Sequence, residues 1–230
     1  SLSALFSVPA LLVVAASQSR KAILMIPLGI IILLFLKNLG NRSFFKSFFR
    51  IVLSLALFAA VLVLISRISI FRGVNERLTS MIASFTGEGA ADGSSLLRKK
   101  MREVGFAQFL KTPIFGIGIG CSDVLLQHTI NRSTYLHNNY IELLACGGIV
   151  GTALYYVPRL ALLRDFWSSR FLRNRQAIAC LTILLLYLIM DYGEVSYSEK
   201  VYYLYLLMLF VQADKLRENN HQTWEDGADE

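Results

Sequence analysis

The sequence contains few of the residues and motifs that are typical of disulfide-rich, metal-binding and cofactor-binding proteins. It has three cysteines, an odd number, and three histidines, with no metal-ligand spacing among them, so neither a disulfide framework nor a metal centre is predicted. Its glycine-rich stretch lacks the strand-turn-helix context of a dinucleotide site. Residues 1–10 carry no basic residue, which excludes a signal peptide there. Because the chain begins with Ser1 inside an apolar run, we expect a fragment or processed product that lacks an N-terminal half.

Apolar residues are abundant instead. They make up 55% of the 230 residues, and the mean hydropathy is +0.52. A soluble domain usually contains about 45–50% apolar residues, so the composition indicates a membrane protein. A bilayer-spanning helix needs about 20 mainly apolar residues, although about 17 can suffice. Six apolar runs meet or approach this length, at 2–16, 22–36, 51–65, 138–157, 176–190 and 201–212.

The basic loops predict the orientation, because short loops rich in Lys and Arg stay in the cytoplasm. The loop 37–50 carries four basic residues and no acid, and the loop 158–175 carries five arginines against Asp165 alone. With six spans, both loops fall on the same side, which agrees with a cytoplasmic location. The turn at Arg20, the long segment before His137 and the loop 191–200 are then expected outside.

We therefore expect an all-α membrane protein with about six transmembrane helices and a long extracytoplasmic segment. The expected regions are transmembrane helices with short loops (1–66), an extracytoplasmic loop (67–136), three further transmembrane helices (137–213) and an acidic, disordered cytoplasmic tail (214–230). In the extracytoplasmic loop, residues 96–111 have a helical pattern with basic and apolar faces, which is typical of an amphipathic helix on the bilayer surface. The apolar face is formed by Leu97, Met101 and Val104.

The most distinctive stretch lies between residues 112 and 151. It begins with Pro113 and glycines at every second position, which mark a bent backbone or a close approach between chain segments. A polar loop then leads to His137 and Asn138, where an apolar helical run begins. A titratable imidazole at the mouth of a membrane helix is a candidate functional group.

Two elements of this stretch resemble a known family. His137-Asn138, nine further residues and Gly148-x-x-Gly151 are similar to the signature of the O-antigen ligase and O-antigen or capsule polymerase superfamily of membrane glycosyltransferases. The preceding TPIFGIGIG resembles the Pro-x-x-Gly-x-Gly element of that family. The resemblance covers roughly residues 15–155, so this chain would be the C-terminal portion of such a protein.

The resemblance implies an arginine site for the pyrophosphate of a lipid-linked donor. Ser17-Gln18-Ser19-Arg20 is similar to a Ser-Arg element of the family, and Arg98 lies at the distance before Pro113 where the family carries another arginine; Arg102 is the alternative. Guanidinium groups bind phosphate oxygens through paired hydrogen bonds. From the residues alone, Arg20 is equally well explained as an interface anchor and Arg98 as a surface charge of an amphipathic helix.

The resemblance also implies that His137 is the catalytic base for an acceptor hydroxyl. Its unperturbed pKa, near 6.5, suits this role, although a histidine that merely caps a helix is the alternative. We predict that Asn138 caps the helix or orients the imidazole, and that Gly148 and Gly151 let a neighbouring helix approach. Supporting roles are expected for Glu142 and Tyr135, while Asp191 and Glu194 are alternatives for an acceptor groove that we leave outside the site.

The resemblance favours a polymerase that joins polyprenyl-pyrophosphate-linked repeat units of O-antigen or capsule on the outer face of the bacterial cytoplasmic membrane. The alternatives are a ligase that transfers the finished glycan to a lipid or protein, and a fragment of a polysaccharide transporter or flippase. No cofactor or metal is expected. The expected partners are the bilayer, an undecaprenyl-pyrophosphate-linked donor, a glycan or lipid acceptor and other polysaccharide-assembly proteins, but no nucleic acid.

Overall fold

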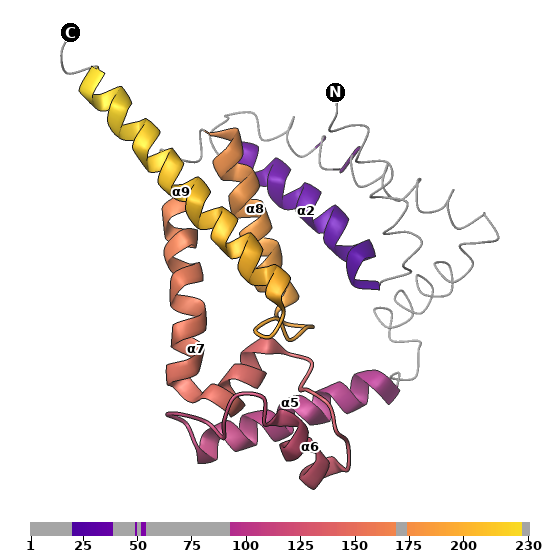
Figure 1. Cartoon of the computed structure of the whole chain (residues 1–230). Helices are drawn as coiled ribbons and strands as arrows, with labels where there is room; N and C mark the ends of the chain where they lie inside the picture. The colour runs from indigo at the N-terminus through magenta and orange to yellow at the C-terminus, as the bar shows by residue number, and fades with distance from the viewer. Residues whose placement is uncertain (1–19, 39–48, 50–51, 54–92, 169–173, 227–230) are drawn as a thin grey trace. The chain divides into compact units, whose positions relative to one another are not determined.

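The computed structural model describes residues 20–38, 49, 52–53, 93–168 and 174–226. All regular secondary structure in these residues is helical (Figure 1), which confirms the all-α prediction for this part of the chain. The chain divides into two compact units, residues 1–92 and 93–230, which are described separately. Several predicted features lie outside the described residues, namely the span 2–16, the tripeptide 17–19 and nearly all of the span 51–65.

In the first unit, the described helix is α2 (Arg20–Asn38). It coincides with the apolar run predicted at 22–36, and its apolar part is Met25–Lys37. Arg20 is its first residue, which agrees with the predicted position of this arginine at a helix end.

The second unit contains five helices in its described residues. They are α5 (Gly93–Lys111), α6 (Ser122–Ile130), α7 (Asn139–Phe166), α8 (Arg175–Met190) and α9 (Lys200–Asp226). Helices α7, α8 and α9 lie side by side and alternate in direction, while α5 and α6 lie at the end where α7 begins (Figure 1). We call that end of the three helices the polar end and the opposite one the basic end.

Hydrogen bonds identify the residues that meet at each end. At the polar end, the Asn138 side-chain amide donates to the Tyr192 carbonyl at 3.0 Å. At the basic end, the Gln212 side-chain amide donates to the Gln176 side chain at 2.9 Å. The up-down-up order of α7, α8 and α9 follows from these two contacts.

Two buried clusters hold the second unit together. The first joins α5 and α6 to the start of α7 and contains Met101, Leu126, Leu136 and Ala145. Leu97 and Val104 pack against it, so the predicted apolar face of residues 96–111 is confirmed. The second joins α7 to α8 and to the loop before α9, and contains Leu143, Tyr155 and Tyr156. Helix α5 therefore lies across the polar end rather than parallel to the three helices.

Three expectations about local structure are wrong. Residues 122–130 form helix α6 where a polar loop was expected. Helix α7 continues past Val157 to Phe166, so Arg159 is a buried helix residue, 6% exposed, and not a loop arginine. Helix α9 runs to Asp226, so residues 214–226 are not a disordered tail.

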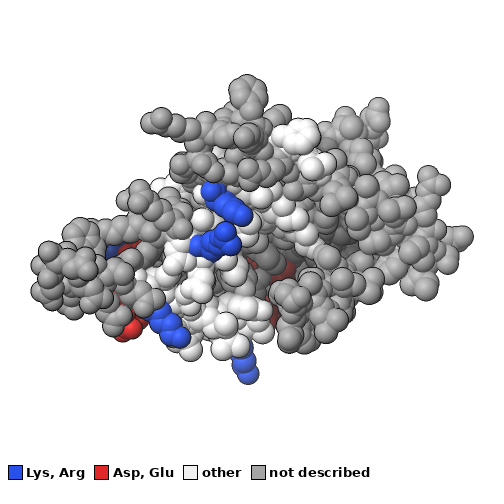
Figure 2. Space-filling view, turned by 90° about the horizontal axis from the view of Figure 1, so that it is seen from above, with Lys and Arg blue, Asp and Glu red and all other residues white. Residues whose placement is uncertain are grey.

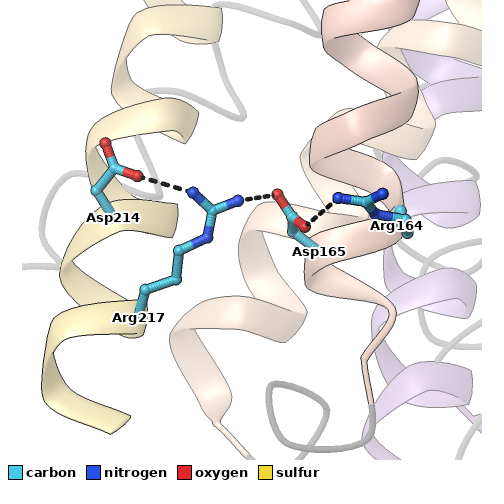
Figure 3. Close-up of polar contacts among 4 residues, drawn as sticks. All are labelled: Arg164, Asp165, Asp214 and Arg217. Carbon is cyan, nitrogen blue, oxygen red and sulfur yellow. Dashed lines mark hydrogen bonds and ion pairs between the residues drawn. The ribbon is translucent and has the colours of Figure 1, made fainter. Parts of the chain in front are cut away.

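The continuation of α9 has a local cause. Ala213 and Leu216 are buried, so the apolar face of the helix extends beyond the predicted span. Arg217 also bridges Asp165 at the end of α7 and Asp214 one turn earlier on α9, the latter at 3.2 Å (Figure 3). Packing and ion pairing thus continue a helix whose composition is mostly polar.

Helix α7 has the length and composition of a membrane-spanning helix. Among the described residues, α7 is the one helix long and apolar enough to cross a bilayer, whereas α8 and Met25–Lys37 of α2 are shorter apolar helices. The part of α7 after Gly148 spans about 27 Å at a rise of 1.5 Å per residue, somewhat less than the ~30 Å hydrocarbon core of a bilayer. Large apolar side chains on α7 and α9 face outward, among them Leu154 (75% exposed), Leu160, Leu204 and Met208. Such exposed apolar faces are typical of contact with lipid.

Candidate functional site

Helix α7 is interrupted at Gly148, and the segment 113–118 is inserted at the break. Gly148 has a φ of 61° and a ψ of −162°, which no α-helix accommodates. The backbone N–H groups of Ile117 and Gly118 donate to the carbonyls of Ala145 and Cys146 at 3.1 and 2.9 Å. These bonds replace helical partners that the break removes.

The same segment also accepts hydrogen bonds from α7. Beyond the break, the N–H groups of Ile149 and Val150 donate to the carbonyls of Pro113 and Ile114, at 2.8 and 3.1 Å. The proline-glycine element and the Gly148-x-x-Gly151 element are therefore two halves of one backbone junction.

Glycine is required at the two closest points of this junction. A Cβ on Gly116 would lie 2.4 Å from the Cys146 carbonyl, and a Cβ on Gly148 would lie 2.3 Å from the Ile114 carbonyl oxygen. Both glycines also have positive φ values, of 68° and 61°. The predicted close approach is confirmed, but the expected partner of Gly148 is wrong: it is an irregular backbone segment and not a neighbouring helix.

Gly151 contributes much less to the junction. A Cβ there would meet the Ile119 side chain at 4.0 Å, an ordinary van der Waals distance. Among the described residues, no close contact supports the helix-packing role predicted for Gly151.

The loop before α7 is anchored on both sides of His137. The Leu136 N–H donates to a carboxylate oxygen of Glu142 at 2.8 Å, and both residues are buried. On the other side, the Asn138 side chain accepts from the Ile141 N–H at 3.0 Å, which confirms its prediction as the N-cap of α7. His137 is thereby held between two fixed neighbours.

His137 itself has a left-handed backbone, with a φ of 55°. This conformation is uncommon for residues other than glycine and costs of the order of 1–3 kcal/mol, so it persists where the surrounding structure imposes it. The imidazole is partly exposed, and its ring centroid lies 4.2 Å from that of Tyr135, with the planes tilted by 50°. The histidine is therefore partly accessible to solvent and flanked by an aromatic ring.

Arg98 lies on the exposed face of α5 and acts electrostatically on Tyr135. Burial raises the pKa of the Tyr135 phenol above 10.0, the nearby Glu194 carboxylate raises it further, and the positive charge of Arg98 lowers it. Arg98 and Glu194 thus both act electrostatically on the ring that contacts His137, from two different parts of the chain.

Arg102, one turn after Arg98, faces a different surface. Its guanidinium carbon lies 5.7 Å from the centre of the Tyr192 ring, within the range of a cation–π contact. Arg20 belongs to the first unit, and its side chain lies outside the described part of the structure. Arg98 therefore acts electrostatically on the ring beside His137, and the placement of Arg20 relative to them remains a prediction.

Two pockets adjoin the His137 loop. The first, of about 490 Å³, is lined by Lys99, Arg102, Asn138 and Tyr192 together with Phe106, Tyr140, Ile141 and the single carboxylate of Glu103. We call it the basic pocket. The second, of about 370 Å³, is lined by the carboxylates of Asp123, Glu142, Glu194 and Glu199 and by the Tyr135 and Tyr197 phenols, with further hydroxyl groups. We call it the acidic pocket.

The pockets approach His137 from opposite neighbours in the chain. Asn138, the residue after it, lines the basic pocket, and Tyr135, whose ring contacts it, lines the acidic pocket. His137 itself lines neither pocket, but residues close to it in the chain line both.

A buried polar network, which was not predicted from the sequence, lies directly behind this region. The Asn139 backbone N–H donates to the Asp191 carbonyl at 2.8 Å, and the Asn139 side-chain oxygen accepts from the N–H groups of Ser196 and Tyr197. The Asp191 carboxylate accepts from the hydroxyls of Tyr156, at 2.9 Å, and Ser196. These bonds fix the loop between α8 and α9 against the start of α7.

The network continues along α7 to a buried arginine. The Tyr155 and Ser196 hydroxyls lie 2.8 Å apart, and the Arg159 guanidinium lies 3.5 Å from the centre of the Tyr155 ring. An arginine within an apolar run and an asparagine pair before it were the available signals for this network. Asp191, expected as an alternative for the acceptor groove, instead joins α7 to the loop before α9.

The match to known families covers the region that contains this junction. The family model described as O-antigen ligase matches residues 5–156, more than half of the chain. No curated protein gives a significant match. The matched range includes the whole backbone junction at Gly148, the His137 loop and both arginines of α5. The chain therefore belongs to the O-antigen ligase family.

Proposed function

We propose that the protein is a membrane glycosyltransferase that polymerises polyprenyl-pyrophosphate-linked repeat units of O-antigen or capsule. The family supports glycosyl transfer of this type, and the site geometry supports the roles of the residues. The observation that carries the proposal is the setting of His137: its backbone is held in a left-handed conformation between two anchored neighbours, its imidazole contacts Tyr135, and residues on either side of it in the chain line two pockets.

In the proposed reaction, the oxygen of an acceptor hydroxyl attacks the anomeric carbon of the donor sugar. His137, in its neutral form, takes the hydroxyl proton as the new glycosidic bond forms. The bond between the anomeric carbon and the pyrophosphate oxygen breaks, and the electron pair leaves with the pyrophosphate. Arg98, with Arg20 from the first unit, stabilises the developing negative charge, and Arg102 and Lys99 supply further positive charge in the basic pocket.

In the proposed reaction, guanidinium groups neutralise the negative charge of the departing pyrophosphate, so we propose that the reaction needs no metal ion. Asn138 and Glu142 act through His137, because they hold the backbone on either side of it. Tyr135 positions the imidazole ring by contact.

We propose that the site faces the extracytoplasmic side of the bacterial cytoplasmic membrane, in a bundle of six spans. At the basic end, exposed Arg164 lies in the last turn of α7, exposed Arg175 begins α8, and exposed Lys215 and Arg217 lie on α9, where Arg217 pairs with Asp165 of α7. Figure 2, which views the molecule from above, shows exposed Lys and Arg more prominently than Asp and Glu on the described surface. Positive charge of this kind favours the cytoplasm, which leaves the polar end outside.

One alternative is a ligase that transfers a finished glycan to a lipid or protein acceptor, as the description of the family would suggest. A transporter or flippase fragment is a further alternative, but the functional residues of such proteins cluster near the middle of the membrane. Here the candidate side chains lie at the polar end, before the break in α7. This position favours chemistry at the membrane surface.

The experiment that tests the proposal is the glycan profile of a deletion strain complemented with the wild-type chain or with His137→Ala. Loss of a polymerase leaves single repeat units on the acceptor, whereas loss of a ligase leaves long chains that are not attached to it. Long attached chains of wild-type length in the His137→Ala strain would refute the catalytic role of His137. Purified protein treated with EDTA should keep its transfer activity.

A further inference from the structure

We propose that the acidic pocket binds the acceptor saccharide and selects a neutral or amino-bearing sugar over a sugar that carries a carboxylate. The proposal rests on the proposed function, since it identifies the second substrate of the same site. It starts from the pocket itself, whose volume of about 370 Å³ falls within the range of about 300–1,000 Å³ typical of small-molecule sites.

The pocket has a buried floor and an exposed rim. Ser122 (3% exposed) and Glu142 (1% exposed) form the floor with Val195, and Ser133, Ser198 and Glu199 lie on the exposed rim. The floor is rigid, because the Glu142 carboxylate is fixed by the Leu136 N–H and by Ser122. A ligand therefore enters from the solvent side and meets a preorganised surface.

The lining matches the hydrogen-bonding needs of a saccharide. Burial raises the pKa of the Tyr197 phenol to about 12, so its hydroxyl stays protonated at neutral pH. Tyr197, Tyr135 and the serine and threonine hydroxyls can donate or accept, and the carboxylates of Glu194 and Glu199 accept. Sugar hydroxyls, which both donate and accept, are complementary to such a mixture.

The charge of the lining sets the selectivity. Four carboxylates line the pocket, and no described Lys or Arg does. A uronic acid placed there would have its carboxylate near like charges, with Arg98 acting on the pocket only from outside its lining, which is unfavourable. A neutral sugar avoids this cost, and a protonated amino group gains from the same carboxylates.

A cation site is a poorer explanation for these acids. In the described part of the chain, no group of three or more His, Cys, Asp or Glu side chains is arranged to hold a metal ion. The acids are instead interspersed with hydroxyl and phenol groups around the cavity. This arrangement suits a polyhydroxylated ligand.

The position of the pocket explains how the acceptor reaches the base. Tyr135 both lines the pocket and contacts the His137 ring at a centroid distance of 4.2 Å. Arg98, whose charge reaches the same phenol, does not line the pocket. An acceptor bound in this pocket would thus contact the aromatic ring that packs on the imidazole.

Cysteine reporters test the proposal without any need for turnover. In a Cys121→Ser, Cys180→Ser background, Ser198→Cys places a thiol on the rim of the pocket, and Thr129→Cys on the exposed face of α6 provides the matched control. The measurement is the rate of modification by a cationic and an anionic methanethiosulfonate. We expect the cationic-to-anionic rate ratio to be several-fold higher at residue 198 than at residue 129, and to fall when Glu194→Gln and Glu199→Gln are added. Equal ratios at the two reporters would overturn the charge assignment.

Three disaccharides of similar size then test the ligand class by protection of the residue 198 reporter. They are chitosan disaccharide (cationic), N,N′-diacetylchitobiose (neutral) and hyaluronan disaccharide (anionic). We expect protection by the first two and little by the third, with the difference reduced in the double glutamine variant. Protection by none of them, or equal protection by the anionic sugar, would overturn the proposal.

The outcomes separate this inference from the proposed function. If the sugars protect while His137→Ala remains fully active, the saccharide site stands and the proposed chemistry fails. If His137→Ala is inactive while no sugar protects, the acceptor site fails and the catalytic role of His137 stands.

Discussion

The carboxylate of Glu142 and the backbone N–H of Leu136 form a buried hydrogen bond of 2.8 Å, one residue away from His137. This contact lets the two possible roles of Glu142 be separated. Glu142→Gln keeps an oxygen acceptor for the Leu136 N–H, whereas Glu142→Ala leaves that donor unsatisfied at a cost of about 1–3 kcal/mol. If Glu142 only positions the loop, transfer activity should be largely kept in the glutamine variant and lost in the alanine variant. Equal loss in both variants, measured as kcat on purified protein, would instead indicate proton transfer by Glu142.

Replacement of His137 should stop the chemistry without unfolding the protein. We expect His137→Ala to lower the transfer rate about 10²- to 10⁴-fold, the usual contribution of a general base. The melting temperature in detergent should fall little, because the imidazole is partly exposed. His128→Ala, on the exposed surface of α6, is the control and should keep wild-type activity. A His137→Ala variant with unaltered rate would contradict the assignment.

Replacement of Arg98 should weaken donor binding. We expect Arg98→Ala to raise the KM for the lipid-linked donor and to lower the rate, with partial recovery in Arg98→Lys, since an ammonium keeps the charge but not the paired hydrogen bonds. Lys100→Ala removes an exposed charge from the same helix and is the matched control. An equal change of KM in both alanine variants would show that general surface charge, and not Arg98 itself, is responsible.

The two glycines of the Gly-x-x-Gly element should differ sharply in their tolerance to alanine. Gly148→Ala places a methyl group against the Ile114 carbonyl at a positive φ, and we expect it to lower the free energy of unfolding by more than about 2 kcal/mol. In Gly151→Ala, the added methyl group makes only an ordinary van der Waals contact, so the free energy of unfolding should fall much less. Thermal unfolding of both variants in the same detergent checks this prediction. Similar melting temperatures would contradict the close backbone contact at Gly148.

The buried Asp191 should make the stability depend on pH. Burial raises its pKa above the ordinary 3.8, despite the hydrogen bonds from Ser196 and Tyr156 that lower it. The folded state therefore holds the proton more tightly than the unfolded state, so stability falls as the pH rises from about 3.8 through the raised folded pKa. Asp191→Asn removes this contribution. The difference in unfolding free energy between wild type and variant should change over that pH window, and a constant difference would contradict the raised pKa.

The sequence predicted the helices whose signal is local and missed those that depend on packing. Long apolar runs predicted α2, α8 and the first part of α7, because lipid or core burial of a whole run needs no information from elsewhere. Pro158 and Arg159 looked like a loop, yet Arg159 is accommodated in α7 by the Tyr155 ring and carbonyl. The short helix α6 has mixed polarity and is held by Leu126 in a cluster built from several segments.

The candidate site shows the same division. The glycine pattern predicted a close backbone approach, and the asparagine after His137 predicted a cap, because both signals are confined to neighbouring residues. The partner of Gly148 lies some thirty residues earlier in the chain, and the partner of Asn139 lies at Asp191. Contacts between residues so far apart in the chain produce no periodic pattern in a single sequence, so only the structure shows them.

The break in α7 makes both halves of one helix depend on a distant segment of the chain. Of the four backbone hydrogen bonds between α7 and residues 113–118, two involve carbonyls before Gly148 and two involve N–H groups after it. A displacement of this inserted segment would therefore be transmitted in both directions along α7, to the turn that carries Glu142 and to the turns beyond Gly148.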